Sequence, residues 1–236
     1  GFAGLTNKKL GSRVQCICVA YEGMERFFPA DKIVMTGNPI RSIIVPATPE
    51  MKEAGIKEYG LDPSRKHIFI VGGSLGSARF NQCMKEWISD GCPGLDGVDV
   101  LWQCGKHYRP DIDRFMDEQR TKNPGVARHI HHSDFIGRME LAYAAADVVI
   151  SRSGASSVSE LCAARKAVIF IPSPNVAEDH QTHNAMALVK KDAAVVVKDA
   201  EAMEKMIPTA LELLKDPARI ATLEENAGKM ALPDAA

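Results

Sequence analysis

From residue 66 onward, short apolar runs alternate with segments of helical pattern. The apolar runs predict strands, and they lie at residues 67–71, 98–104, 127–131, 148–150, 167–172 and 193–198. Strands that are apolar throughout and separated by helices indicate a parallel sheet with both faces covered. The pattern therefore predicts a Rossmann-like, doubly wound α/β domain. Ligands of such domains bind beyond the carboxyl ends of the strands.

The first 62 residues fit this pattern less well. Residues 14–20 and 32–36 are predicted strands, joined by the helical segment 22–28 and followed by an irregular, proline-rich stretch. Two strands and one helix do not form a stable core alone. We therefore expect residues 1–41 to be the remnant of an N-terminal domain, residues 42–62 an interdomain linker, and residues 63–236 the ligand-binding domain, ending in a truncated helical tail. The two early strands are expected to be disordered or to pair between chains.

Composition excludes several classes of protein. The 236 residues carry a net charge of −1, which argues against nucleic acid as a partner. No apolar run approaches the ~20 residues that cross a bilayer. The six cysteines form no CxxC pair, which is typical of reduced thiols in a cytoplasm. A metal site at His129, His131 and His132 is an alternative, but we interpret these residues as a solvated strand end.

The segment SRSGASSVSE, residues 151–160, has the strongest chemical signature. A predicted strand enters a small-residue turn, and a helix then begins. The helix N-terminus offers free N–H groups and partial positive charge to a phosphate. Glu160, about 7 Å further along the helix, can accept two hydrogen bonds from a diol such as a ribose. The alternative is a capping box, in which Ser157 and Glu160 bond the helix start instead.

A second glycine turn follows the first strand of the domain. The sequence GGSLGSAR, residues 72–79, is neither a Walker A loop nor a GxGxxG dinucleotide motif. Ser74 can donate to a phosphate there, whereas the alternative is a tight turn with Ser74 or Ser77 as N-cap. Two small-residue turns at one sheet edge favour the interpretation of ligand binding over that of helix capping alone.

Two further segments belong at the same edge. Gln181 and Asn184 share one helix face and can bond sugar hydroxyls, although a polar first turn capped by Asp179 is the alternative. Arg41, after a predicted strand, can reach a diphosphate across a cleft, or can be a surface arginine.

Four ordered motifs together resemble one family. They are TGNPIR (36–41), GGSLGSARFNQ (72–82), SRSGASSVSE (151–160) and EDHQTHNA (178–185). The family is MurG, the peptidoglycan transferase that adds N-acetylglucosamine to the lipid-linked muramyl-pentapeptide precursor. The resemblance implies a GT-B fold, in which two Rossmann-like domains flank the site and the C-terminal domain holds the UDP-sugar.

The resemblance also implies roles for particular residues. Glu160 would bind the ribose, and the backbone of Ile136 would recognise uracil. Ser74 and Arg41 would contact the diphosphate, and Gln181 and Asn184 would hold the N-acetylglucosamine. The nucleotide would be lined by the backbone of Ala155, Ser156, Ser157, Val158 and Ser159. Many members have two adjacent glutamines where this chain has His180 and Gln181, which puts one sugar contact in doubt.

The implied reaction is an inverting displacement. A base in an upstream domain would deprotonate the muramyl 4-hydroxyl, which attacks the anomeric carbon as UDP leaves. Fixed donors would stabilise the leaving diphosphate, so we expect no metal and no cofactor. The partners would be UDP-N-acetylglucosamine, the lipid-linked acceptor and the cytoplasmic face of the bacterial inner membrane. On its own the chain would bind the donor without activity. The alternative is a non-catalytic UDP-sugar-binding subunit or scaffold that needs a membrane partner.

Overall fold

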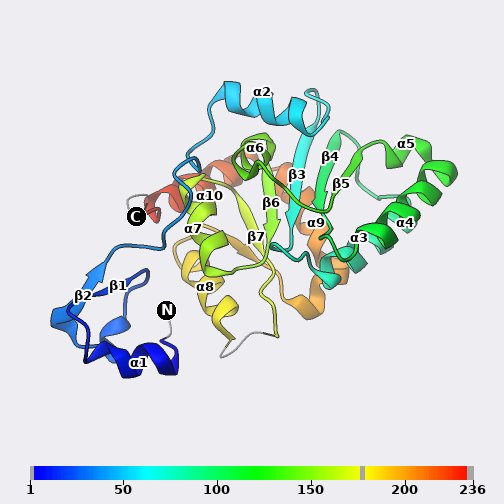
Figure 1. Cartoon of the computed structure of the whole chain (residues 1–236). Helices are drawn as coiled ribbons and strands as arrows, with labels where there is room; N and C mark the ends of the chain where they lie inside the picture. Colours follow the sequence, from blue (N-terminus) through cyan, green and yellow to red (C-terminus); the bar gives the residue numbers. More distant parts are fainter. Residues whose placement is uncertain (1–2, 176–178, 233–236) are drawn as a thin grey trace.

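The protein is built around a six-stranded parallel sheet (Figure 1). The computed structural model describes residues 3–175 and 179–232. The strand order is β5-β4-β3-β6-β7-β8. The strands are β3 (Lys66–Val71), β4 (Val98–Gln103), β5 (Ile130–Ser133), β6 (Val148–Ser151), β7 (Val168–Phe170) and β8 (Val195–Val196). All six predicted strands are present, and the predicted α/β class is confirmed.

The order of the strands reverses at β3. Ile68 of β3 pairs with Val100 of β4 on one side and with Val148 of β6 on the other. The chain therefore winds outward first in one direction and then in the other, which leaves a crevice at the carboxyl ends of β3 and β6. The turns after these two strands are the two glycine turns of the sequence.

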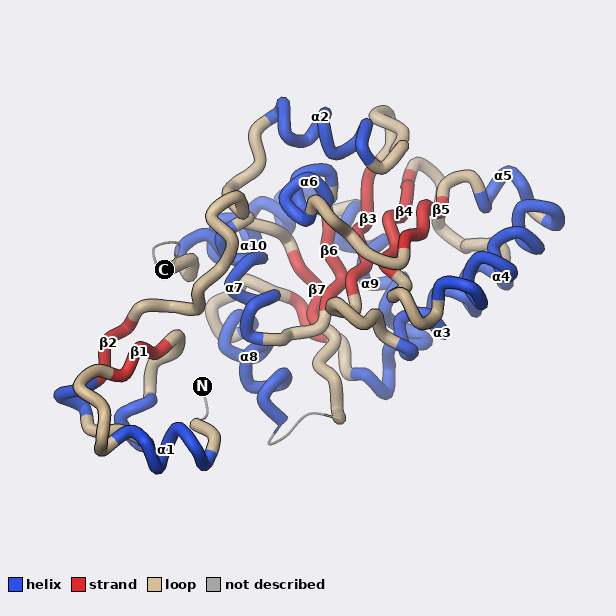
Figure 2. Tube along the Cα trace, viewed as in Figure 1, coloured by secondary structure: helices blue, strands red, loops and turns tan. Residues whose placement is uncertain are grey.

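Helices cover both faces of the sheet, as Figure 2 also shows. One face carries α3 (Ala78–Ser89), α4 (Arg109–Lys122) and α9 (Ala202–Leu214), and the other carries α6 (Met139–Ala145), α7 (Ala155–Ala163) and α8 (His180–Val189). The short α5 (Pro124–Ala127) precedes β5, and α10 (Pro217–Lys229) packs against α7 and α9. Successive residues of β3 alternate between the two faces: Ile68 and Ile70 enter one buried layer, and Phe69 and Val71 the other. Both faces of the central strands are covered, which explains why β3, β6 and β7 are mostly apolar.

The segment predicted as a linker is partly helical. Helix α2 (Pro49–Glu58) begins after Thr48, whose side chain accepts a hydrogen bond from the Met51 N–H at 3.3 Å. It packs along α6, and Gly55 lies so close that an added Cβ would meet the Leu141 carbonyl oxygen. The N-cap threonine and the proline at the first helical position were signals for this helix. The apolar pattern did not predict this helix, because the segment contains few apolar residues. Its stability comes instead from packing on α6.

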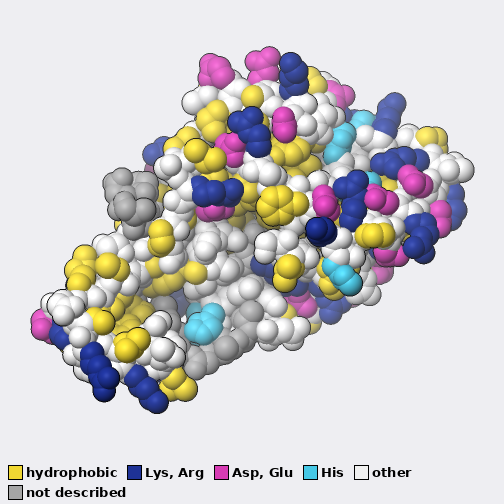
Figure 3. Space-filling view, in the orientation of Figure 1, with side chains coloured by type: hydrophobic (Ala, Val, Ile, Leu, Met, Phe, Trp, Pro, Cys, Tyr) yellow, Lys and Arg dark blue, Asp and Glu magenta, His cyan; other side chains and the backbone are white. Residues whose placement is uncertain are grey.

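The N-terminal segment contains α1 (Leu5–Gly11), β1 (Ile17–Val19) and β2 (Ile33–Met35), with the short 3-10 helices η1 (Met24–Arg26) and η2 (Ala30–Lys32) between the strands. The expectation of disorder is wrong for β1 and β2, because they pair in parallel with each other. Pairing of this small sheet with another chain stays a prediction. Val19, Met24 and Phe28 form a small buried cluster with Ala3. Figure 3 shows hydrophobic side chains gathered over this segment at the lower left, and Leu5, Leu10, Val34 and Met35 are exposed there.

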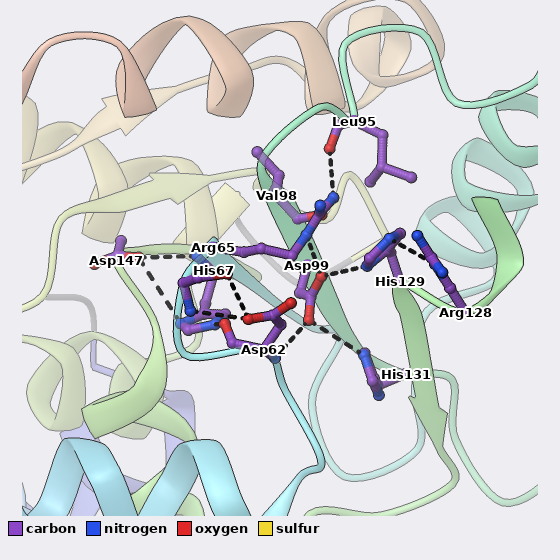
Figure 4. Close-up of polar contacts among 11 residues, drawn as sticks. Asp62, Arg65, His67, Leu95, Val98, Asp99, Arg128, His129, His131 and Asp147 are labelled. Atoms are coloured by element: carbon purple, nitrogen blue, oxygen red, sulfur yellow. Dashed lines mark hydrogen bonds and ion pairs between the residues drawn. The ribbon is translucent and has the colours of Figure 1, made fainter. Parts of the chain in front are cut away.

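The amino edge of the sheet holds a buried ion-pair network (Figure 4). Asp99, at the start of β4, is 1% exposed. Its carboxylate lies 2.7 Å from Arg65 Nε, 2.8 Å from His129 Nδ1 and 3.5 Å from His131 Nε2. The backbone N–H of Asp62 donates to it at 2.8 Å. Burial alone raises the pKa of Asp99, but His131, this N–H and His129 outweigh it and lower the pKa to about 2.

The histidines are therefore not the solvated strand end that the sequence suggested. His129 and His131 point toward Asp99, whereas His132 points to the other face and lies 2.7 Å from Asp113. The expected division of side chains between two faces is correct, but each histidine has a carboxylate partner. Within residues 3–175 and 179–232, no helix is long and apolar enough to span a bilayer.

Candidate functional site

The site begins with two turns that lie side by side. The first joins β3 to α3, and the second joins the neighbouring strand β6 to α7. Gly76 of the first turn has φ +77°, and a Cβ there would meet the Cys104 carbonyl. A glycine at this position is therefore required by both backbone conformation and space. Ser77 is the N-cap of α3 and accepts from the Phe80 N–H at 3.3 Å, so the capping alternative is correct for Ser77. Ser74 remains exposed on the turn.

A small cavity of about 190 Å³ opens beside these turns. It gathers residues from five separate segments of the chain, including five residues that the motifs and the family resemblance had predicted. Those five are Arg41, Ser74, Ile136, Ser157 and Glu160. Val71, Gly73, Gln103, Phe135, Met139 and Tyr143 complete the lining. The walls are mostly apolar, and the only charged side chains among the lining residues are Arg41 and Glu160.

The Glu160 carboxylate is held by partners from two elements. Arg41 donates from Nε at 3.2 Å and from Nη2 at 3.1 Å to the same oxygen, Oε1. The Tyr143 hydroxyl donates to the other oxygen, Oε2, at 3.2 Å. Burial and the neighbouring Glu160 charge raise the pKa of Tyr143 well above its usual value, so this hydroxyl stays protonated.

This geometry excludes the capping box. Helix α7 begins at Ala155 with Gly154 as N-cap, and no side chain caps it. Glu160 therefore lies beyond the first turn, with its carboxylate directed at Arg41 and Tyr143 rather than at the helix start. The free N–H groups at the start of α7 remain available to an anion.

A second cavity, of about 560 Å³, adjoins the first. The two share Gly73 and Ser157 in their linings, so a ligand can extend from one into the other. The larger one is lined by both turns and by charged residues that sequence reasoning missed: Arg79, Arg152 and Asp199. A long, phosphorylated ligand fits such a pair of cavities.

Arg152 is the centre of this missed group. Its guanidinium donates to Asp199 Oδ1 at 2.6 Å, to the Ile171 carbonyl at 2.9 Å and to Ser77 Oγ at 3.0 Å. Arg79 lies 3.3 Å from Asp199 Oδ2. Arg152 thus ties the two turns together and places positive charge beside them. Its position directly after a buried strand was the signal, because the carboxyl ends of all six strands meet at this edge.

Gln181 and Asn184 lie at the start of α8, and both line a large cleft of about 800 Å³ next to the N-terminal segment. The Gln181 side-chain oxygen accepts from the Ser173 N–H at 2.9 Å, and Asn184 donates to the Ser153 carbonyl at 3.1 Å. Asp179 stands at the N-cap position, but its side chain makes no cap bond to the helix, so the capping alternative is wrong there. Glu178 of the fourth motif lies outside the described residues.

The other predicted residues of α7 lie in different surroundings. Ala155 lines the large cleft, and Ser156 is exposed. Val158 is 3% exposed and packs into the core. Ser159 accepts a hydrogen bond from Asn38 at 2.9 Å, which fastens the TGNPIR segment to α7.

Residues 67–236 match the family model for the glycosyltransferase family 28 C-terminal domain. The chain belongs to this glycosyltransferase family. Of the residues that the structure describes, no three or more His, Cys, Asp or Glu side chains form a group able to hold a metal ion.

Curated relatives of this family 28 chain share the name that its motifs suggested. A "UDP-N-acetylglucosamine--N-acetylmuramyl-(pentapeptide) pyrophosphoryl-undecaprenol N-acetylglucosamine transferase" of Bacteroides thetaiotaomicron is 46% identical over 235 residues. The match covers 100% of this chain and 61% of that protein. A protein of the same name from Bacteroides fragilis is 48% identical, with 100% and 60% covered. The resemblance to MurG is confirmed, and the chain spans about 60% of the length of these relatives.

Solved structures support the fold of the family 28 chain. MurG of Acinetobacter baumannii has a TM-score of 0.68 at 24% identity, over 97% of this chain and 60% of that one. The C-terminal CMP-Kdo binding domain of WaaA, also from Acinetobacter baumannii, has a TM-score of 0.58 at 12% identity, over 80% of this chain and 97% of that domain. The sheet is therefore that of a GT-B C-terminal domain.

Proposed function

We propose that this chain binds UDP-N-acetylglucosamine as the donor part of an inverting N-acetylglucosaminyltransferase. The observation that carries the proposal is the Glu160 carboxylate, which lies in a mostly apolar cavity at the switch point of the sheet. Uracil would bind beside the Ile136 backbone, with the ribose on Glu160. The names of the curated relatives support this choice of donor.

The rest of the donor would extend along the shared wall of the two cavities. The diphosphate would lie between the turns, near Ser74, Ser157 and the start of α7, where N–H groups and a positive helix end are available. The sugar would reach Gln181, which lines both the second cavity and the large cleft. Arg152 would hold the two turns at the spacing that the diphosphate needs.

The complete protein would transfer the sugar to the 4-hydroxyl of lipid-linked muramyl-pentapeptide at the cytoplasmic face of the inner membrane. In this proposal residues 1–41 belong to the acceptor-binding domain, and residues 63–236 form the donor domain. The large cleft between the N-terminal segment and α8 supports this division, because donor and acceptor must meet there. Fixed donors at the diphosphate would stabilise the leaving UDP without a metal.

Calorimetric titration of the chain with UDP tests the donor site. We expect Glu160→Gln to weaken UDP binding at least about tenfold, because a charged acceptor of two hydrogen bonds is replaced by a neutral amide. The ligand 2′-deoxy-UDP should bind the wild-type chain more weakly than UDP and should respond less to this substitution. Glu212→Gln, on the surface of α9, is the matched control and should leave binding unchanged.

Two results would overturn the proposal. One is the absence of UDP binding by a chain whose circular dichroism shows it to be folded. The other is equal binding of UDP by the wild type and by Glu160→Gln.

A further inference from the structure

Both oxygens of the proposed ribose-binding carboxylate are already engaged within the chain. Arg41 bonds Glu160 Oε1, and Tyr143 bonds Oε2. A ribose diol presents two hydroxyl donors and needs acceptor positions that point into the cavity. A carboxylate offers about four acceptor positions, and the two Arg41 donors and the Tyr143 hydroxyl already occupy most of them. A ribose that places both hydroxyls on Glu160 must therefore displace one of these donors.

The two partners differ in how easily they can leave. Tyr143 is 2% exposed, and its ring packs edge-on against Phe69 with 5.9 Å between the centroids. Moving Tyr143 would disrupt the core. The Arg41 side chain is 45% exposed, and both of its donors address a single oxygen instead of forming the two-oxygen fork. Such half-exposed pairs contribute little to stability, so Arg41 is the partner that can be displaced.

The same cavity also offers Arg41 an alternative binding partner, the proposed diphosphate. Gly73, Ser74 and Ser157 line the cavity with this arginine, and Gly73 and Ser157 form the wall shared with the second cavity. This is the place of the diphosphate in the proposed function. A guanidinium binds a diphosphate more strongly than it binds a half-exposed carboxylate, because it gains more charge and more acceptor oxygens.

We propose that Arg41 is a specificity switch that competes with the ribose for Glu160 and leaves it only when a diphosphate takes its charge. A nucleoside without phosphates must break the Arg41–Glu160 pair and offers the released guanidinium no anionic partner. A nucleoside diphosphate breaks the same pair and then binds the released guanidinium. The exchange makes the site discriminate against uridine. This inference rests on the proposed function and adds a selectivity to it.

Arg41→Met tests the switch, with uridine and UDP titrated separately by calorimetry. Methionine keeps an unbranched apolar side chain but removes the charge. Uridine should bind about threefold more tightly to the variant, since breaking an exposed ion pair costs an amount of this order. UDP should bind about tenfold more weakly, because a charge-assisted contact to the diphosphate is lost. A rise in uridine affinity together with a fall in UDP affinity would show that Arg41 exchanges Glu160 for the diphosphate.

Arg138→Met is the matched control. Arg138 is also an exposed arginine close to the cavity, and its Nε lies 2.9 Å from Glu140 Oε1. It does not line the cavity, so neither affinity should change in this variant.

Three outcomes would overturn the switch. If both ligands bind more weakly to Arg41→Met, Arg41 only positions Glu160. If both bind more tightly, Arg41 only blocks the site. If uridine affinity does not change, whether or not UDP affinity falls, Arg41 does not compete with the ribose for Glu160.

The failure of this inference is distinguishable from the failure of the proposed function. UDP binding that depends on Glu160, combined with any of these three outcomes, leaves the donor site intact and rejects only the exchange. UDP binding that is insensitive to Glu160→Gln rejects the site itself.

Discussion

The two edges of the central sheet each hold a carboxylate with a basic partner, yet they differ in what surrounds them. Asp99 at the amino edge is buried, and its partners are Arg65 just before β3, His129 just before β5 and His131 within β5. Glu160 at the carboxyl edge lines a cavity, and its partner Arg41 is nearly half exposed. A charged residue that is enclosed by fixed partners serves the fold. One that faces a cavity with an exchangeable partner can serve a ligand.

The largest expected effect falls at the amino edge. Asp99→Asn should lower the free energy of unfolding by about 3 kcal/mol, because Arg65 loses its buried partner. Urea denaturation at neutral pH measures this loss. UDP affinity of the folded variant should stay unchanged, since this network lies at the opposite edge from the cavity. Asp117→Asn, in a largely exposed pair with Arg120, is the control and should leave the urea midpoint unchanged. A destabilisation no greater than that of the control would contradict a stabilising role for the network.

The pH dependence of stability is a second test of whether the buried Asp99 carboxylate stabilises the fold. The pKa of Asp99 falls from 3.8 to about 2 on folding, so the unfolded chain takes up the proton first as the pH falls. The contribution of Asp99, about 2 kcal/mol, is complete above its unfolded pKa and is lost as the pH falls toward 2. Urea midpoints at about pH 5 and about pH 2.5 should therefore differ more in the wild type than in Asp99→Asn. Equal differences in the two proteins would show that Asp99 does not carry this dependence.

The smallest effect is expected at the carboxyl edge. Tyr143→Phe keeps the ring on Phe69 but removes the hydroxyl that holds Glu160. UDP binding should weaken by about 1 kcal/mol, roughly fivefold, because the carboxylate loses one hydrogen bond that orients it. Stability should change little. Calorimetry with UDP, and the same titration in a Glu160→Gln background, measures the coupling. Additive effects of the two substitutions would argue against a positioning role for Tyr143.

Much of the fold was predictable because its local and global signals agree. Strands such as β3 and β6 are easily recognised, since burial on both faces makes their central residues a run of apolar side chains. Helix α2 was not predicted, because its apolar face is slight and its stability comes from packing on α6. The histidines at and beside β5 were misread for a related reason: their partners Asp99 and Asp113 lie on other elements, 19 or more residues away in the sequence.

The candidate site was predictable in its members but not in its arrangement. The motifs pointed to Arg41, Ser74, Ser157 and Glu160, and the family resemblance added Ile136; these five line one cavity. The motif SRSGASSVSE itself left a capping box open for Glu160. No local pattern pointed to Tyr143 or Asp199 as partners, because a tyrosine in an alanine-rich helix and an aspartate after a short strand are ordinary in sequence.

The sequence by itself determined the alternation of strands and helices, the two small-residue turns and the family to which the chain belongs. These features depend on residue type and spacing, which are local. Only the tertiary structure decided which partners each carboxylate has. That choice depends on strand order: β3 and β6 are neighbours, which brings the two turns together, while the TGNPIR segment brings Arg41 onto α7. Glu160 thus faces a cavity and an exchangeable partner, whereas Asp99 is enclosed by partners that lie in or beside paired strands.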